Sequence, residues 1–193
     1  MQKIVINRKL LNIFRAIIIA YLVLFFALFV RGVIMKKYIY PLKYSEIVIK
    51  YSKEYNLNSA LIFATIKVES NFNENAVSNK GAIGLMQIKE STANYIANML
   101  KEKEFDLYNA NTNIKYGCHY LNYLIKRFNN IETAIVAYNA GEGRVSEWLK
   151  NKEYSENGIT LTKIPYKESK EYKEKIIESF RKYTKLYKNI LDK

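Results

Sequence analysis

The stretch SALIFATIKVES, residues 59–70, shows most clearly which kind of fold this chain adopts. Ser59 belongs to a residue type that often caps a helix, and the apolar residues after it recur with helical rather than alternating spacing. Ile62, Ile66 and Glu69 lie at positions i, i+4 and i+7, so a carboxylate continues the apolar stripe of one helix face. We therefore predict a helix that begins after Ser59 and ends at Glu69, where a hydrophobic residue would be expected.

A glutamate in this position has two possible roles. A carboxyl group held against apolar walls is harder to ionise, so its pKa rises and it can remain a proton donor near neutral pH, as a general acid must. Alternatively, Glu69 turns its side chain from the helix end into the solvent and takes no part in chemistry. The stretch alone leaves both roles open, and its neighbours in the sequence must decide.

The chain beyond Pro41 continues the helical pattern. Caps and periodicity predict further helices. One opens at Ser45, one runs over about 91–100 with Ser91 as its candidate cap, two cover about 111–128 and 130–138, a short one ends near Trp148, and the last covers about 169–190. Residues 71–84 and 151–163 are polar or rich in Asn and Gly, which predicts loops. No convincing pair of alternating strands is visible, so we predict an all-α domain with a small irregular excursion near residues 151–165.

Composition limits the size and chemistry of this domain. The chain has 193 residues, 49% of them hydrophobic, which suits the core of one compact domain with at most a short appendage. One Cys and one His exclude a disulfide framework within the chain and leave too few soft ligands for a zinc site. We therefore expect no metal and no cofactor.

Charge points to an anionic partner. The formal net charge of +13 suits a nucleic acid, an anionic lipid or an anionic wall polymer. Most of the basic residues are Lys rather than Arg, and no arginine-rich or RNP-like segment is present, although Arg does most base recognition. We therefore expect no nucleic-acid partner.

Residues 16–30, AIIIAYLVLFFALFV, are apolar without interruption. A membrane span needs about 20 residues, and residues 13–35 reach that length if Arg15 and Arg31 extend their charges toward the headgroups. A buried core helix and a cleaved signal peptide are the alternatives. Both flanks are basic, and residues 27–35 offer neither an A-x-A-like cleavage site nor a Cys that could accept lipid. The pattern favours an uncleaved, single-pass signal anchor.

Three further stretches have residue types that packing alone explains poorly: SNKGAIGLMQI (78–88), AYNAGEGRV (137–145) and IPYKESKEY (164–172). Gly81 and Gly84 permit backbone turns or the close approach of a ligand. Gln87 offers both a donor and an acceptor to sugar-like groups. Each stretch taken singly also has a plain structural explanation, such as a turn, a surface residue or a helix cap.

Taken together, these motifs resemble the lytic murein transglycosylases with the SLT domain and goose-type lysozyme-like fold. The resemblance is in order and spacing, covers about residues 44–187, and is carried by Glu69-Ser70, Ser78, Gly84-Leu85-Met86-Gln87, Ala137-Tyr138-Asn139-Ala140-Gly141, Glu168 and Tyr172. Two departures concern details of the site: Ile83 stands where the family usually has a basic residue, and Glu168-Ser169-Lys170 stands where it usually has Glu-Thr-Arg.

The resemblance implies a helical cleft that binds peptidoglycan and cuts the β-1,4 bond between N-acetylmuramic acid and N-acetylglucosamine. Glu69 matches the family's sole catalytic acid/base. The residues implied to line the saccharide cleft or support the glutamate are Ser78, Met86, Gln87, Tyr138, Asn139 and Glu168. Tyr138 is the candidate hydrogen-bond partner of Glu69 or of the substrate acetamide, and Glu168 is expected to orient the site.

The resemblance also implies a reaction and a place in the cell. Protonated Glu69 would donate to the leaving oxygen, and the same carboxylate would then deprotonate the sugar's C6 hydroxyl, which attacks C1 and forms a 1,6-anhydro end. Because the substrate lies outside the cytoplasm, residues 1–36 would form a short cytoplasmic tail and anchor, and residues 37–193 an extracytoplasmic domain. Three alternatives remain: a muramidase in which water attacks, a non-catalytic wall-binding module of a secretion, conjugation or sporulation apparatus, and a membrane-tethered nucleic-acid binder.

Overall fold

The computed structural model describes residues 8–191, so the first part of the predicted cytoplasmic tail, residues 1–7, lies outside the described residues. The chain divides into two compact units, Met1–Pro41 and Leu42–Lys193, and each is described by itself.

The first unit consists of one long helix, α1 (Arg8–Ile34), which continues as a short π-helix, η1 (Met35–Ile39). None of the residues of α1 is buried, although the helix is apolar around its whole circumference. By length and composition the segment Arg8–Ile39, whose most apolar stretch of 18 residues has a mean hydropathy of 2.7, could cross a membrane. A signal sequence has the same properties, so this helix is compatible with an anchor and with a signal.

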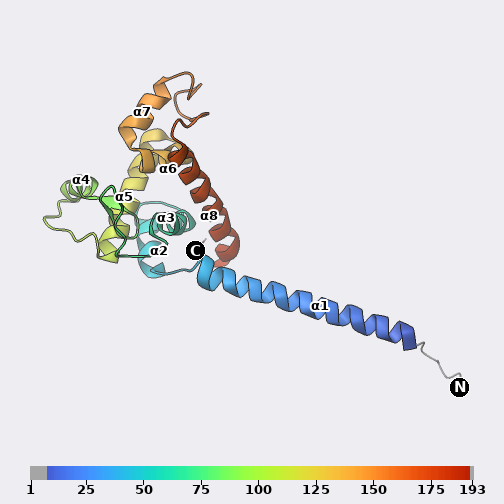
Figure 1. Cartoon of the computed structure of the whole chain (residues 1–193). Coiled ribbons are helices and arrows are strands. Elements are labelled where there is room, and N and C mark those ends of the chain that lie inside the picture. The colour runs from blue at the N-terminus through green and yellow to red at the C-terminus, as the bar shows by residue number, and fades with distance from the viewer. Residues whose placement is uncertain (1–7, 192–193) are drawn as a thin grey trace. The chain divides into compact units, whose positions relative to one another are not determined.

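The second unit is mostly helical, which confirms the predicted fold class (Figure 1). Its helices are α2 (Ser45–Glu54), α3 (Ser59–Ser70), α4 (Glu90–Leu100), α5 (Ala110–Phe128), α6 (Ile131–Ala140), α7 (Glu142–Lys150) and α8 (Lys167–Leu191). Asparagines cap several of them: the side chains of Asn58, Asn109 and Asn130 accept hydrogen bonds from backbone N–H groups in the first turn of α3, α5 and α6.

Two of the predicted serine caps differ from the structure. Asn58, one residue earlier and an equally good cap, takes the role expected of Ser59, whose hydroxyl instead lies 2.6 Å from that of Ser52. Ser91 lies inside α4, which begins at Glu90 after Lys89 and has no side-chain cap. Both helices nevertheless begin within a residue or two of the predicted positions.

The structure also contains a small β-hairpin that the sequence did not predict. Strands β1 (Ala82–Ile83) and β2 (Ile88–Lys89) are antiparallel, with Ala82 opposite Lys89 and Ile83 opposite Ile88. Strands of two residues are too short to show alternation in a sequence. The turn between them carries the GLMQ motif, and Gly84 adopts φ +80° where a Cβ atom would lie only 2.2 Å from Asn113 Nδ2.

Helix α3 lies at the centre of the unit, between α2 and α8. Every residue from Ser59 to Ile66 is buried, and the ring of Phe63 stacks on that of Tyr183 in α8 with 5.4 Å between centroids. A helix that is buried on all sides has a fixed position. Its last turn therefore presents Glu69 from a rigid support.

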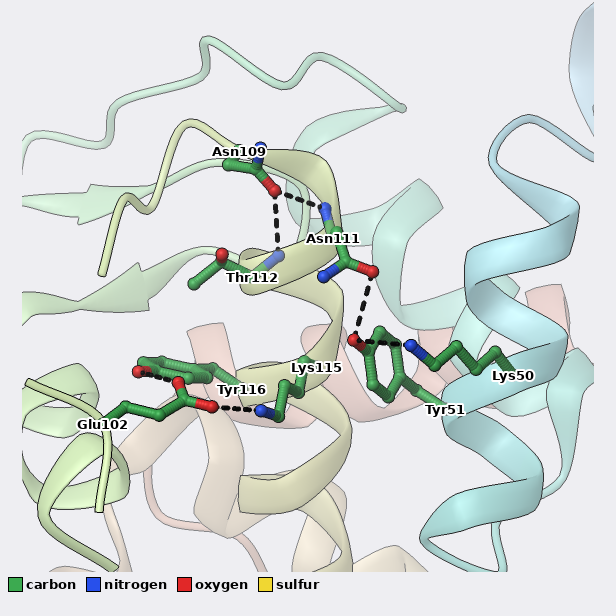
Figure 2. A network of polar contacts seen from close by, with 8 residues as sticks. All are labelled: Lys50, Tyr51, Glu102, Asn109, Asn111, Thr112, Lys115 and Tyr116. Atoms are coloured by element: carbon green, nitrogen blue, oxygen red, sulfur yellow. Dashed lines mark hydrogen bonds and ion pairs between the residues drawn. The ribbon is translucent and has the colours of Figure 1, made fainter. Parts of the chain in front are cut away.

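A polar network surrounds the beginning of α5 (Figure 2). Glu102 pairs with Lys115 and accepts a 2.8 Å hydrogen bond from the hydroxyl of Tyr116, so the segment between α4 and α5 is tied to α5. Tyr51 donates from α2 to Asn111 Oδ1 at 3.1 Å. The network joins α2, α5 and the segment that precedes α5 without using any of the predicted site residues.

Candidate active site

A cleft of about 660 Å³ lies over the end of α3 and gathers most of the predicted site residues. The hairpin, the beginning of α4, and parts of α5, α6 and α8 form its walls. The predicted residues that line it are Glu69, Ser78, Gln87, Tyr138, Asn139 and Glu168. Met86 differs from the others because it is completely buried, with its side chain against Gly117 of α5, and it lies beneath the cleft surface.

Glu69 occupies the last turn of α3, which ends at Ser70 before Asn71 in a left-handed conformation. Its side chain is partly buried, and Oε1 accepts a 2.6 Å hydrogen bond from the hydroxyl of Tyr172. Burial raises the pKa of Glu69 to about 7, against the smaller opposing effect of the Tyr172 hydrogen bond, which favours the ionised form. The carboxyl group can therefore hold a proton and release it near neutral pH, as the apolar stripe led us to expect.

Tyr172, rather than Tyr138, is the hydrogen-bond partner of Glu69. Burial and the nearby Glu69 charge raise the pKa of Tyr172 well above its usual value, so its hydroxyl remains a donor throughout the physiological range. Tyr172 follows Glu168 by four residues on α8 and so lies one turn along the same helix face. Tyr172 is among the residues that carry the family resemblance, and its spacing from Glu168 was the signal that could have marked it as a site residue.

Tyr138 shapes the cleft in another way. Its hydroxyl donates to the backbone carbonyl oxygen of Met86 at 2.9 Å, so α6 is joined to the GLMQ turn. Ser70, at the end of α3, donates to the carbonyl oxygen of the neighbouring Leu85 at 2.8 Å. These two bonds hold the turn against the helix that carries Glu69.

Ser78 and Gln87 brace the same loop from within. Gln87 Nε2 donates to the carbonyl oxygens of Ala76 at 3.1 Å and Gly84 at 2.9 Å. Ser78 Oγ accepts from the backbone N–H of Ala82 at 3.0 Å. Both side chains line the cleft, and both use a polar atom to fix the backbone around it.

Asn113 of α5 supports the turn from below, and sequence reasoning missed it. The side chain is almost completely buried, accepts from the N–H of Met86 at 2.8 Å, and donates to the carbonyl oxygens of Ile83 at 2.9 Å and Leu107 at 2.8 Å. Nothing in the sequence distinguished it from an ordinary polar residue of an amphipathic helix. The GLMQ turn therefore depends on a residue 27 positions further along the chain.

The rim of the cleft is polar and mainly cationic. Glu168 is exposed and forms an ion pair with Lys80 at 3.1 Å, and Asn139 Oδ1 accepts from Ser169 Oγ at 2.7 Å. Arg144 donates to the carbonyl oxygen of Ala140 at 2.8 Å, and Lys89 also lines the cleft. Glu69 and Glu168 are the acidic residues among the described lining residues. Within residues 8–191, no three His, Cys, Asp or Glu side chains form a group that could hold a metal ion.

A helical domain whose central helix delivers one partly buried carboxyl group to a polar cleft is characteristic of the lysozyme-like class. Within that class, the family pattern described as the transglycosylase SLT domain matches residues 46–161. The chain belongs to this family, as the motifs predicted.

Relatives and solved structures agree with this assignment. The soluble lytic murein transglycosylase of Salmonella typhimurium is 32% identical over 144 residues, which are 72% of this chain and 22% of that protein. The membrane-bound lytic murein transglycosylase E of Buchnera aphidicola is 34% identical over 140 residues, 66% of this chain and 64% of that protein. The crystal structure of the 70 kDa soluble lytic transglycosylase of Escherichia coli superposes with a TM-score of 0.66 at 29% identity and covers 76% of this chain and 25% of that one. The chain thus spans about a quarter of the length of the soluble relatives.

Proposed function

We propose that this protein is a membrane-anchored peptidoglycan lytic transglycosylase, which cleaves the bond between N-acetylmuramic acid and N-acetylglucosamine and leaves a 1,6-anhydro end. The observation that carries the proposal is the Glu69 carboxyl group, which lines the cleft with a pKa of about 7. The names of the relatives, which describe lytic murein transglycosylases, support the substrate class.

In the first step, protonated Glu69 donates its proton to the glycosidic oxygen as the bond from that oxygen to C1 breaks. The 2-acetamido oxygen of the muramic acid supports the positive charge that develops at C1. Glu69 is now a carboxylate, and the hydrogen bond from Tyr172 stabilises this form. A pKa near 7 suits a group that must act first as an acid and then as a base.

In the second step, the Glu69 carboxylate removes the proton of the C6 hydroxyl, and the C6 oxygen attacks C1 of the same ring. The proton that Glu69 lost is thereby restored, and no water is consumed. An inverting hydrolase would need a second carboxylate to activate water. Glu168 is the other acid of the cleft, but it is exposed and paired with Lys80, so it is better suited to hold the rim together than to act as a base.

The replacement Glu69→Gln tests this role. The amide cannot donate an acidic proton, so the variant should bind peptidoglycan and lose its ability to clear a suspension of cell walls. Glu147→Gln, at an exposed position of α7 outside the cleft, is the matched control and should clear walls at the normal rate. Normal clearance by Glu69→Gln would remove Glu69 from the mechanism.

Membrane anchoring is part of the same proposal and rests on α1. The full chain should fractionate with membranes and resist extraction by high salt, which would release a peripheral protein held by its charges. The domain would then lie outside the cytoplasm, where its basic rim meets the anionic cell wall. A mature N-terminus near residue 30 would show instead that the segment is a cleaved signal.

A further inference from the structure

A row of tyrosine rings leads away from the cleft between α4 and α5. Tyr138 and Tyr120 line the cleft, with 5.5 Å between their ring centroids. Tyr123 follows at 6.2 Å from Tyr120, in a stacked arrangement, and Tyr95 follows at 6.3 Å from Tyr123. These residues come from α6, α5 and α4, so the row is assembled by the fold and is not visible in the sequence.

The two helices that carry the outer tyrosines, α4 and α5, also contribute residues to the cleft. Thr92 lines the cleft on α4, and Tyr95 lies three residues further on, on the same face of that helix. Tyr120 lines the cleft on α5, and Tyr123 lies three residues further along α5. Because α4 and α5 are in contact, the surface that begins inside the cleft extends outward along the two helices.

The rings of the row differ in how far they are buried. Tyr120 and Tyr123 pack their inner sides against a core cluster that includes Leu124 and Val136, which accounts for their partial burial and fixes their orientation. Tyr95 is 50% exposed and makes its ring contact with Tyr123. Met99, one turn later on α4, is also exposed, so this helix carries an apolar surface beside the cleft.

Such a surface has the chemistry that recognises sugar rings. The face of a pyranose carries C–H bonds with partial positive charge, which lie favourably over the negative face of an aromatic ring. Tyrosine adds a hydroxyl for the sugar's polar edge, and it loses little conformational entropy because it has few rotatable bonds. The exposed ring of Tyr95, which meets the ring of Tyr123 edge to face at 6.3 Å, offers such a contact beyond the rings at the cleft.

We propose that Tyr120, Tyr123 and Tyr95 form an outer binding surface for the glycan strand where it leaves the cleft. This inference rests on the proposed function, because the cleft must first hold a glycan for its continuation to reach Tyr95. The surface gives the protein a preference for long strands over short ones. We expect a short oligosaccharide held in the cleft to leave Tyr95 uncovered, whereas a long strand would contact the whole row.

The test measures binding rather than turnover. The full chain carrying Glu69→Gln, in detergent micelles, is titrated with a trimer of N-acetylglucosamine and with long glycan strands freed of their peptides. Adding Tyr95→Ala should weaken binding of the long strands about tenfold, the loss expected for one aromatic stacking contact, and should leave binding of the trimer unchanged. Tyr95→Phe keeps the ring and should retain the affinity for long strands.

Tyr108→Ala is the matched control, because Tyr108 is 47% exposed but lies in the segment before α5 and does not line the cleft. It should bind both glycans normally. Long-strand binding that is insensitive to Tyr95→Ala, or an equal loss for both glycans, would overturn this inference and leave the proposed function standing. Failure of the Glu69→Gln chain to bind either glycan would refute the proposed function and the inference with it.

Discussion

The raised pKa of Glu69 has a consequence for stability that can be measured without any substrate. The pKa is about 7 in the folded protein, against 4.5 for an ordinary glutamate. Below pH 4.5 the carboxyl group is protonated in both the folded and unfolded states. As the pH rises from 4.5 through 7, the unfolded chain releases this proton more readily, so the folded state loses stability until both states are ionised. The pKa difference corresponds to a loss of about 3 kcal/mol.

Replacing Glu69 by Gln removes this loss. The amide has nearly the same shape, cannot ionise, and its oxygen can still accept the hydrogen bond from Tyr172. The free energy of unfolding of Glu69→Gln should therefore exceed that of the wild type by about 1 kcal/mol near pH 5 and about 3 kcal/mol near pH 8. In a domain of this size, each kcal/mol changes Tm by about 2–4 °C.

Thermal unfolding of the two proteins across this pH range is the assay, with the exposed Glu147→Gln as the control for a simple change in net charge. The control should show no pH-dependent gain. If the advantage of Glu69→Gln stays constant with pH, or shrinks as the pH rises, then Glu69 is not a carboxyl group with a raised pKa and the reasoning fails.

Two further predictions concern the groups that support Glu69. Tyr172→Phe removes the hydrogen bond that favours the ionised carboxylate, so the pKa of Glu69 should rise further. The alkaline limb of the pH dependence of kcat/KM should then move to higher pH. An unmoved limb would mean that Tyr172 does not act through Glu69. Asn113→Ala should lower the free energy of unfolding by about 3 kcal/mol, because buried partners in and near the GLMQ turn lose their hydrogen bonds. The control Asn98→Ala, at an exposed site of α4, should have little effect. Equal effects of the two variants in denaturant unfolding would contradict the role given to Asn113.

The sequence predicted most of the helices because the relevant forces are local. Amphipathic spacing and capping residues act within one or two turns, so α5 and α6 begin within two residues of the expected positions. The hairpin of β1 and β2 was not predictable, since it depends on tertiary bonds such as those from Asn113 to the GLMQ turn. The cap of α3 is Asn58 and not Ser59, because the sequence cannot distinguish between two adjacent residues that cap helices equally well.

The sequence indicated which residues line the cleft better than it indicated which of them contact one another. The helix period predicted that Glu69 shares a face with Ile62 and Ile66, and in the structure Glu69 lies in the last turn of α3 and lines the cleft. The partner of Glu69 depends on how α8 packs against α3, and Tyr172 lies 103 residues away in the chain. Met86 was expected in the cleft wall, but whether a residue of a turn faces the cleft or the core depends on backbone angles that a sequence does not reveal.

In the proposed mechanism a hydroxyl group of the substrate, rather than water, attacks C1. Intramolecular attack by the C6 hydroxyl has a large effective-concentration advantage over water when the cleft holds the ring correctly. The test is to digest peptidoglycan with the full chain in water labelled with ¹⁸O and to examine the released muropeptides by mass spectrometry. The released products should carry no label at C1 and should be lighter by one water than the products of hydrolysis. Predominantly ¹⁸O-labelled reducing ends would contradict this mechanism and would identify the protein as a muramidase.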